Sequence, residues 1–138
     1  MRLLLIFIGF LLLGCAVNAD QASCHEKDGY INRESLIKLI DLDCSDNELS
    51  GLCSILLGSP LNVEGREFKL FTFLRRENNK IKTYLNMKPK RTESDARIGF
   101  EFSESEADQI TIISVYENIE GCTLRSSVNL GVYFDKAS

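Results

Sequence analysis

The cysteines are the side chains of this chain best suited to chemistry, because a thiol pair can form a disulfide and a thiolate can bind a metal or attack a substrate. Cys24, Cys44, Cys53 and Cys122 follow an apolar N-terminal stretch that contains the fifth, Cys15. Four cysteines permit three pairings. A disulfide between Cys44 and Cys53 closes about ten residues and is worth just under ~3 kcal/mol. One between Cys24 and Cys122 closes about a hundred and is worth about 4.7 kcal/mol. We therefore predict this nested pairing.

The other polar residues form no catalytic or metal-binding pattern. A calcium loop is suggested in composition alone by Asp41, Asp43, Asp46 and Glu48. An EF-hand needs glycine where this chain has Asp46, and a bidentate glutamate where it has Leu52. The single histidine, His25, lacks the spacing of a zinc site, and a disulfide at Cys24 would leave it no thiolate to activate. We expect no enzyme activity, no metal and no cofactor.

The first nineteen residues have the pattern of a secretory signal peptide. Arg2 provides the positive charge, Leu3 to Leu13 form an apolar run of eleven, and small residues precede a cleavage site after Ala19. A membrane-spanning helix needs about 20 apolar residues, so an uncleaved anchor is the weaker alternative. A second alternative is a bacterial lipoprotein box at Leu12-Leu13-Gly14-Cys15. We predict a secreted, extracellular protein.

Cleavage after residue 19 leaves residues 20–138 as one secreted domain, because 119 residues suffice for one core but hardly for two. Arg2 is the only charged residue of the leader, so 15 basic and 20 acidic side chains remain and the net charge is −5. Because nucleic-acid-binding domains are usually basic, we do not expect this acidic chain to bind nucleic acid.

From Leu52 onward, apolar and polar residues alternate in short bursts, which is typical of half-buried strands. The alternation is clean over Arg97 to Phe102 and over Val128 to Phe134. Both faces are apolar in Phe68 to Leu74, Ile81 to Met87 and Gln109 to Tyr116, so these strands should lie between two layers or beside a cavity.

Turn residues separate these bursts at 58–60, 77–80, 88–91 and 117–121. This spacing predicts an all-β, immunoglobulin-like, two-sheet antiparallel β-sandwich with about seven strands, stapled by disulfides. Residues 33–42 stay open between helix and strand, because Asn32 could cap a helix and the apolar residues at 36, 37 and 40 have helical spacing.

Two segments of the chain resemble the ML-domain lipid-recognition family, which includes cholesterol-carrying Niemann-Pick proteins and mite group 2 allergens. The first runs from Ile37-Lys38 to Cys44, then through Cys53-Ser-Ile-Leu-Leu-Gly58-Ser-Pro60 to Phe68. The second is Ile110 to Leu124, followed by Val128 to Phe134. The family's third cysteine pair has no counterpart between Cys53 and Cys122. The resemblance implies the same nested disulfides.

The resemblance also implies lipid binding, with a sterol or fatty-acyl ligand held between the two sheets for transport or recognition. The residues expected to line that space are Phe71, Phe73, Leu85, Ile98, Phe100, Phe102, Ile112 and Val132. Alternation describes a filled core equally well. In that case the chain is a non-enzymatic binding module, or a defence or effector protein, that acts through its surface on an extracellular protein partner.

Charge is concentrated in residues 75–97, which contain eight basic and three acidic side chains in an otherwise acidic chain. The basic residues are Arg75, Arg76, Lys80, Lys82, Lys88, Lys90, Arg91 and Arg97. A basic rim of this kind predicts transient contact with a membrane surface. The alternative is an ordinary solvated strand face.

Overall fold

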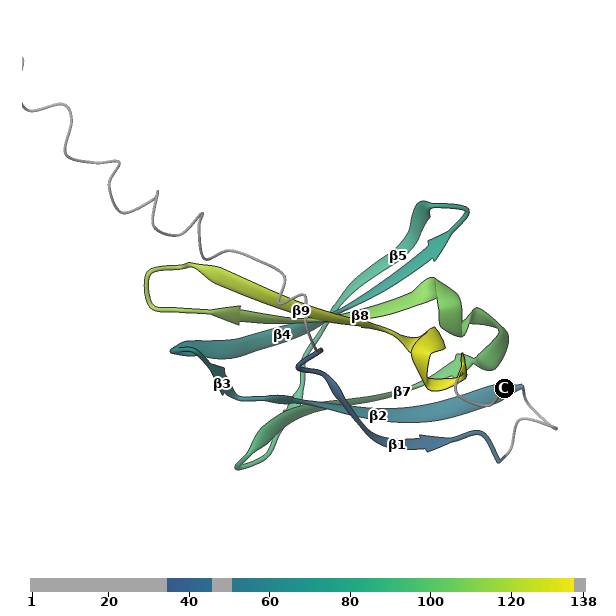
Figure 1. Cartoon of the computed structure of the whole chain (residues 1–138), viewed down its shortest axis with the longest axis horizontal. Helices are drawn as coiled ribbons and strands as arrows, with labels where there is room; N and C mark the ends of the chain where they lie inside the picture. Colours follow the sequence, from purple (N-terminus) through teal and green to yellow (C-terminus); the bar gives the residue numbers. More distant parts are fainter. Residues whose placement is uncertain (1–34, 46–50, 136–138) are drawn as a thin grey trace, which may run out of the picture.

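The computed structural model describes residues 35–45 and 51–135, which form two antiparallel sheets packed face to face (Figure 1). The predicted all-β sandwich with a disulfide staple is confirmed. Among the described residues there are nine strands, of which seven have six or more residues and two have only two. The predicted signal peptide lies outside the described residues.

One sheet has the strand order β1-β2-β7-β6. Its strands are β1 (Lys38–Asp43), β2 (Leu52–Pro60), β7 (Asp95–Ser103) and β6 (Lys90–Arg91). The other has the order β3-β4-β8-β9, with β5 also paired to β4. Its strands are β3 (Asn62–Val63), β4 (Arg66–Glu77), β5 (Lys80–Met87), β8 (Ile110–Glu117) and β9 (Thr123–Asn129). Two short 3-10 helices, η1 (Glu104–Gln109) and η2 (Leu130–Tyr133), lie after β7 and β9. We call these the four-stranded and five-stranded sheets.

The open segment 33–42 contains the start of strand β1, which begins at Lys38. Leu39 lies opposite Leu57 and Leu42 lies opposite Ile55, with an irregularity in the register between Leu39 and Asp41. One extra residue there disturbs the period of two. The helical spacing therefore arose because Leu36 and Ile37 precede the strand and Ile40 is the extra residue of the bulge.

Two boundaries predicted from the sequence are wrong. Gly58-Ser59-Pro60 is not a turn but the end of β2, where Ser59 pairs with Ala96 of β7. The predicted strand Val128 to Phe134 ends at Asn129, whose side chain accepts a hydrogen bond from the Gly131 N–H at 2.9 Å. Because this local bond replaces ladder pairing, the chain turns into η2.

The other predicted breaks hold in whole or in part. Residues 118–122 form a loop between β8 and β9, while 88–91 include the short strand β6. Asn78 and Asn79 connect β4 to β5 with φ of 51° and 62°. Two consecutive positive φ values are the geometry of a two-residue hairpin turn, which asparagine tolerates better than most residues.

The inner disulfide joins Cys44, just after β1, to Cys53 near the start of β2, with a Cα–Cα distance of 4.2 Å. This half of the predicted nested pairing is confirmed. Cys122 is buried and disulfide-bonded. Its predicted partner, Cys24, lies outside the described residues. The confirmed bridge ties the edge strand β1 to β2 within the four-stranded sheet.

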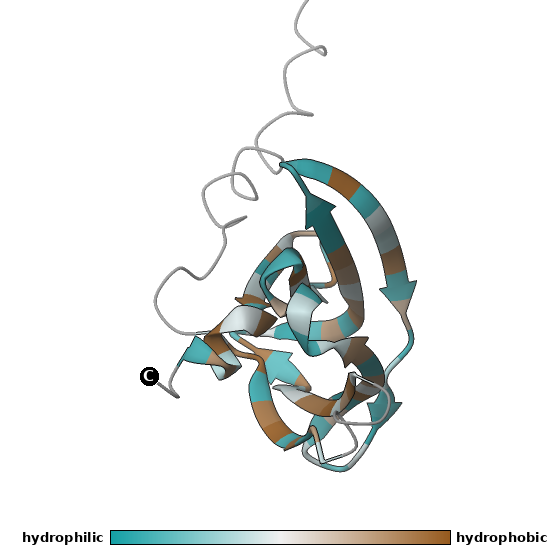
Figure 2. Ribbon diagram, turned by 90° about the vertical axis from the view of Figure 1, so that its right-hand side faces the viewer, coloured by the Kyte–Doolittle hydropathy of each residue, from teal (hydrophilic) through white to brown (hydrophobic). Residues whose placement is uncertain are grey.

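The core lies between the sheets, where alternate residues of β2, β4, β7 and β8 meet. Apolar and polar positions alternate along the ribbons in Figure 2. The alternation along β4 is shifted by a bulge between Phe68 and Leu70, which lets Phe68 and Phe71 both enter the core. In residues 35–45 and 51–135, no helix is long and apolar enough to cross a membrane.

Candidate functional site

Six of the eight residues expected to line a lipid site belong to the core or pack against it. Phe71, Ile98, Phe102 and Ile112 are buried, and the partly buried Phe73 and Phe100 pack on them. The ring centroids of Phe73 and Phe100 are 5.6 Å apart at 87°. Those of Phe100 and Phe102 are 6.1 Å apart, so the aromatic rings form a continuous row between the sheets.

The other two predicted residues are exposed. Leu85 is 44% exposed and lies opposite Phe73, so it shares the inner face of the five-stranded sheet at its β5 edge. Val132 is 45% exposed in η2. That these eight residues bind a ligand stays a prediction.

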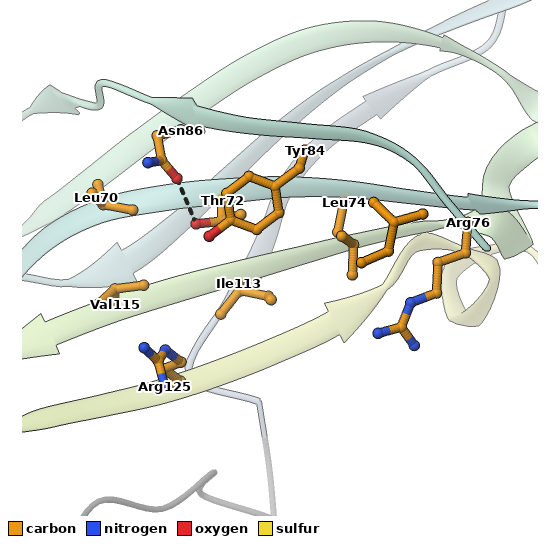
Figure 3. A pocket seen from close by; sticks show the side chains of 10 residues that line it. Leu70, Thr72, Leu74, Arg76, Tyr84, Asn86, Ile113, Val115 and Arg125 are labelled. Carbon is orange, nitrogen blue, oxygen red and sulfur yellow. Dashed lines mark hydrogen bonds between the residues drawn. The ribbon is translucent and has the colours of Figure 1, made fainter. Parts of the chain in front are cut away.

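A groove of about 410 Å³ lies on the opposite, outward face of the five-stranded sheet (Figure 3). The strand register builds it, because Leu70 pairs with Val115, Thr72 with Ile113, and Leu74 with Tyr84. Residues that pair directly across strands share a face. The groove is therefore a mainly apolar surface that four strands share, with these lining residues: Leu70, Thr72, Leu74, Arg76, Ile81, Tyr84, Asn86, Ile113, Val115 and Arg125.

Burial differs between the floor and the wall of this groove. Thr72 and Leu74 are 3% and 6% exposed and form the floor, whereas Tyr84 on β5 is 63% exposed and lies along one side (Figure 3). Thr72 Oγ1 donates a hydrogen bond to Asn86 Oδ1 at 3.1 Å, which fixes β5 against β4 on this face. The floor is therefore buried and the Thr72 hydroxyl is hydrogen-bonded, whereas the Tyr84 ring is exposed to solvent.

Two arginines flank the groove at opposite ends (Figure 3). Arg125 of β9 lies opposite Val115, and Arg76 of β4 lies opposite Ile81 near the hairpin turn. Neither guanidinium forms an ion pair or hydrogen bond with any residue that the structure describes. Both therefore keep their full donor capacity for an anionic group, which arginine binds in bidentate geometry.

A buried tyrosine next to Val115 joins the two sheets. The Tyr116 hydroxyl of β8 donates a hydrogen bond to the Pro60 carbonyl of β2 at 2.9 Å and lies 2.6 Å from Ser59 Oγ. Burial raises the pKa of Tyr116 above its ordinary value, against the opposing effect of the hydrogen bonds to Ser59 and Ser114. This side chain fixes the spacing of the sheets.

Three of the eight basic residues in 75–97 have partners within the fold. Arg75 binds Glu106 at 2.9 Å, Arg97 binds Asp95 at 2.9 Å, and Arg91 donates to the Phe68 carbonyl at 2.9 Å. The hydrogen bonds from Arg97 and Thr92 hold the pKa of Asp95 below its ordinary value. The remaining five cations are exposed at the β4–β5 hairpin and just beyond it: Arg76, Lys80, Lys82, Lys88 and Lys90.

The cluster of metal-ligand types found in the described part of the chain consists of Cys44, Cys53 and Glu104. The two sulfurs are bonded to each other, so no thiolate is available and the cluster offers no metal site. Asp41 and Asp43 lie on β1. Asp46 and Glu48, the other two residues of the calcium pattern, lie outside the described residues.

Comparison of this chain with protein-family models, with curated proteins and with solved structures finds no match. The site is therefore interpreted from its own geometry. Sequence reasoning missed the groove, although it did identify β4, β5 and β8 as strands with two apolar faces. The missing information was the register, which places Leu70, Ile113 and Arg125 on one surface.

Proposed function

We propose that this domain is a secreted, non-enzymatic binding protein that holds a fatty-acyl ligand with an acidic headgroup in the groove on the five-stranded sheet. The observation that carries the proposal is a mainly apolar groove with, at each end, a guanidinium that no described residue pairs with. Its volume of about 410 Å³ falls within the range of small-molecule sites, roughly 300 to 1,000 Å³. Each CH₂ group buried there contributes about 0.8 kcal/mol.

A guanidinium at each end of the groove favours a fatty acid over a sterol. A carboxylate accepts two parallel hydrogen bonds from a guanidinium, and an uncharged sterol hydroxyl cannot use that geometry. Arg125 adjoins Val115, and Arg76 adjoins Ile81, so at either end a headgroup would lie beside an apolar side chain. The proposal keeps the ligand class that the family resemblance implies and moves the site to the other face of the sheet.

The state of the inner face supports this placement. The rings of Phe73, Phe100 and Phe102 already contact one another between the sheets, so a ligand there would have to displace them. Protein interiors are close-packed, and such displacement costs packing energy. The outward groove is open without rearrangement.

The test is displacement of a fluorescent fatty acid from the purified protein below its micelle-forming concentration. We expect Ile113→Glu to weaken binding at least about tenfold, because it places a carboxylate on the apolar surface beside the ligand. Arg125→Gln should weaken binding of the acid but not of the corresponding alcohol. The matched control is Ile119→Glu, because Ile119 is fully exposed in the β8–β9 loop away from the groove. Thermal unfolding of each variant verifies that it is folded.

One variant separates the two placements of the ligand. Leu85 lies on the inner face at an exposed edge, so Leu85→Glu changes the expected inter-sheet site without entering the packed core. Loss of fatty-acid binding in Leu85→Glu, with normal binding in Ile113→Glu, would return the site to the space between the sheets. Normal binding in both variants would contradict each lipid proposal.

A second candidate is recognition of an extracellular protein, and the exposed edge of β5 favours it. Within the described residues β5 pairs only with β4, and an unpaired strand edge can bind an added strand. Proline in place of Tyr84 should abolish such binding, because the Tyr84 N–H faces the open edge whereas those of Thr83 and Leu85 face β4. Cross-linking of the pure protein to a purified partner, compared between wild type, Tyr84→Pro and Tyr84→Ser, tests this candidate independently of lipid, because Tyr84→Ser keeps the backbone donor.

A further inference from the structure

The β4–β5 hairpin extends past the rest of its sheet. Pairing of β4 with β8 stops at Arg75 opposite Ile110, whereas β4 and β5 stay paired as far as Glu77 opposite Lys80. The turn at Asn78 and Asn79 closes the hairpin, which projects from the sandwich in Figure 1. The tip therefore has solvent on both faces.

Exposed apolar side chains are concentrated on this hairpin. Of the eight large apolar side chains that are exposed in the described part of the chain, three lie within five residues of β5. Ile81 is 57% exposed, Tyr84 63% and Leu85 44%. Tyr84 lies opposite Leu74 on the outward face and Leu85 lies opposite Phe73 on the inward face. Because these side chains lie on opposite faces of the hairpin, packing one face against the rest of the protein would still leave the other face exposed.

Unpaired cations surround these apolar side chains. Residues 76–88 contain four basic side chains and one acidic, Glu77, a local charge of +3 in a chain whose net charge is −4. Each of the four is exposed, and none forms an ion pair with any residue of 35–45 or 51–135. The four are Arg76, Lys80, Lys82 and Lys88. Arg75 and Arg97, in contrast, are neutralised within the fold.

We propose that the β4–β5 hairpin docks on a membrane surface rich in anionic headgroups. Cations attract such a surface over about a Debye length, and tyrosine is favoured at the level of the headgroups. Ile81 and Leu85 then enter the apolar boundary beside the cations. The charge complementarity selects an anionic surface, because the hairpin has a local charge of +3 and the rest of the chain is net acidic.

Docking of the hairpin does not require a ligand in the groove. If the groove also binds a fatty acid, as proposed above, docking brings the groove to the membrane, because Arg76, Ile81 and Tyr84 belong to both the hairpin and the groove wall. A docked hairpin places the Arg76 end of the groove at the headgroups, so an acyl chain could pass between membrane and protein without crossing bulk water.

The experiment is co-sedimentation of the protein with phosphatidylcholine vesicles, with and without phosphatidylserine. We expect binding only where phosphatidylserine is present, and its loss as ionic strength rises from about 0.1 M to about 1 M. Lys80→Gln with Lys82→Gln should weaken binding about ten- to thirtyfold. Lys38→Gln with Lys69→Gln removes the same charge elsewhere on the described surface, and this control should bind nearly as wild type.

A second pair of variants tests the apolar contribution. Tyr84→Ser with Leu85→Ser should lower vesicle binding several-fold at unchanged net charge, whereas Val132→Ser should not. Equal binding to both kinds of vesicle, or equal effects of the Lys80/Lys82 and Lys38/Lys69 variants, would overturn the proposal. Binding of a purified protein partner through the hairpin, without vesicle binding, would also overturn it. Binding of monomeric fatty acid in solution is scored separately, so failure of docking is distinct from failure of the groove.

Discussion

The two faces of the five-stranded sheet are both apolar, and only one of them is covered by the other sheet. On the inner face Phe71 and Ile112 are fully buried. On the outer face their neighbours Leu70, Ile113 and Val115 are only partly buried and line an open groove. Burial between the sheets accounts for the apolar side chains of the inner face. The partly exposed side chains of the outer face are the ones on which the binding proposal rests.

Truncating a side chain on the inner face should have the largest effect on stability. Phe71→Ala leaves a cavity among the core rings, so the free energy of unfolding should fall by about 3 to 5 kcal/mol. Val115→Ala on the outer face removes two methyl groups that are only partly buried, and should cost about 1 kcal/mol. Urea unfolding with unchanged m-values measures both. Equal losses would mean that the outer face is as covered as the inner one.

The next largest effect on stability concerns the Cys44–Cys53 disulfide, which joins β1 to β2 in the four-stranded sheet. Replacing Cys44 and Cys53 by serine should lower the free energy of unfolding by just under ~3 kcal/mol, because the loop between them regains its freedom in the unfolded chain. Denaturant unfolding measures the loss. Fatty-acid affinity at the groove should stay within about twofold once the folded fraction is taken into account. A large loss of affinity would link the groove to the opposite sheet.

A smaller effect follows from the tyrosine that joins the sheets. Tyr116→Phe leaves the buried Ser59 hydroxyl without its partner, and should cost about 1 to 3 kcal/mol. Differential scanning calorimetry of Tyr116→Phe and of Tyr116→Phe with Ser59→Ala measures it. The double variant should recover part of the loss, because no buried hydroxyl then remains unpaired. Failure to recover would show that the bond to Pro60 accounts for the whole effect.

The smallest effect is a dependence of stability on alkaline pH. Burial raises the pKa of Tyr116, and also that of Tyr133, above the ordinary value of about 10. The native state therefore binds more protons than the unfolded state above that pH, and stability must fall as pH rises further. Urea midpoints should be flat below about pH 10 and decline above it, less steeply in Tyr116→Phe. An equally steep decline in that variant would assign the effect to Tyr133.

The alternation of residues predicted the sandwich because inward and outward positions differ in polarity over most strands. It failed at Gly58-Ser59-Pro60, where turn residues continue a strand whose partner, β7, runs alongside to Asp95. It failed again at Val128 to Phe134, where the side chain of Asn129 ends the ladder. Local composition contains neither the length of the neighbouring strand, which decides the first boundary, nor the side-chain hydrogen bond that decides the second.

The site was harder to predict than the fold because it depends on register. Phe68, Phe71 and Phe73 break the period of two, and only the bulge after Phe68 reveals that all three face inward. Leu70 and Leu74 are thereby assigned to the outer face. Arg76 and Arg125 are 49 positions apart in the chain and flank one groove only through the pairing of four strands. The sequence signal for the groove was that β4, β5 and β8 have apolar side chains on both faces.

The most direct test of the groove is methyl NMR of the isoleucine side chains during titration with a fatty acid. Ile112 and Ile113 are adjacent in the sequence and lie on opposite faces of β8. We predict that the methyl signals of Ile113 and Ile81 shift with added ligand while those of Ile112 and Ile98 stay in place. Shifts of Ile112 and Ile98 with an unmoved Ile113 would contradict the account and place the ligand between the sheets.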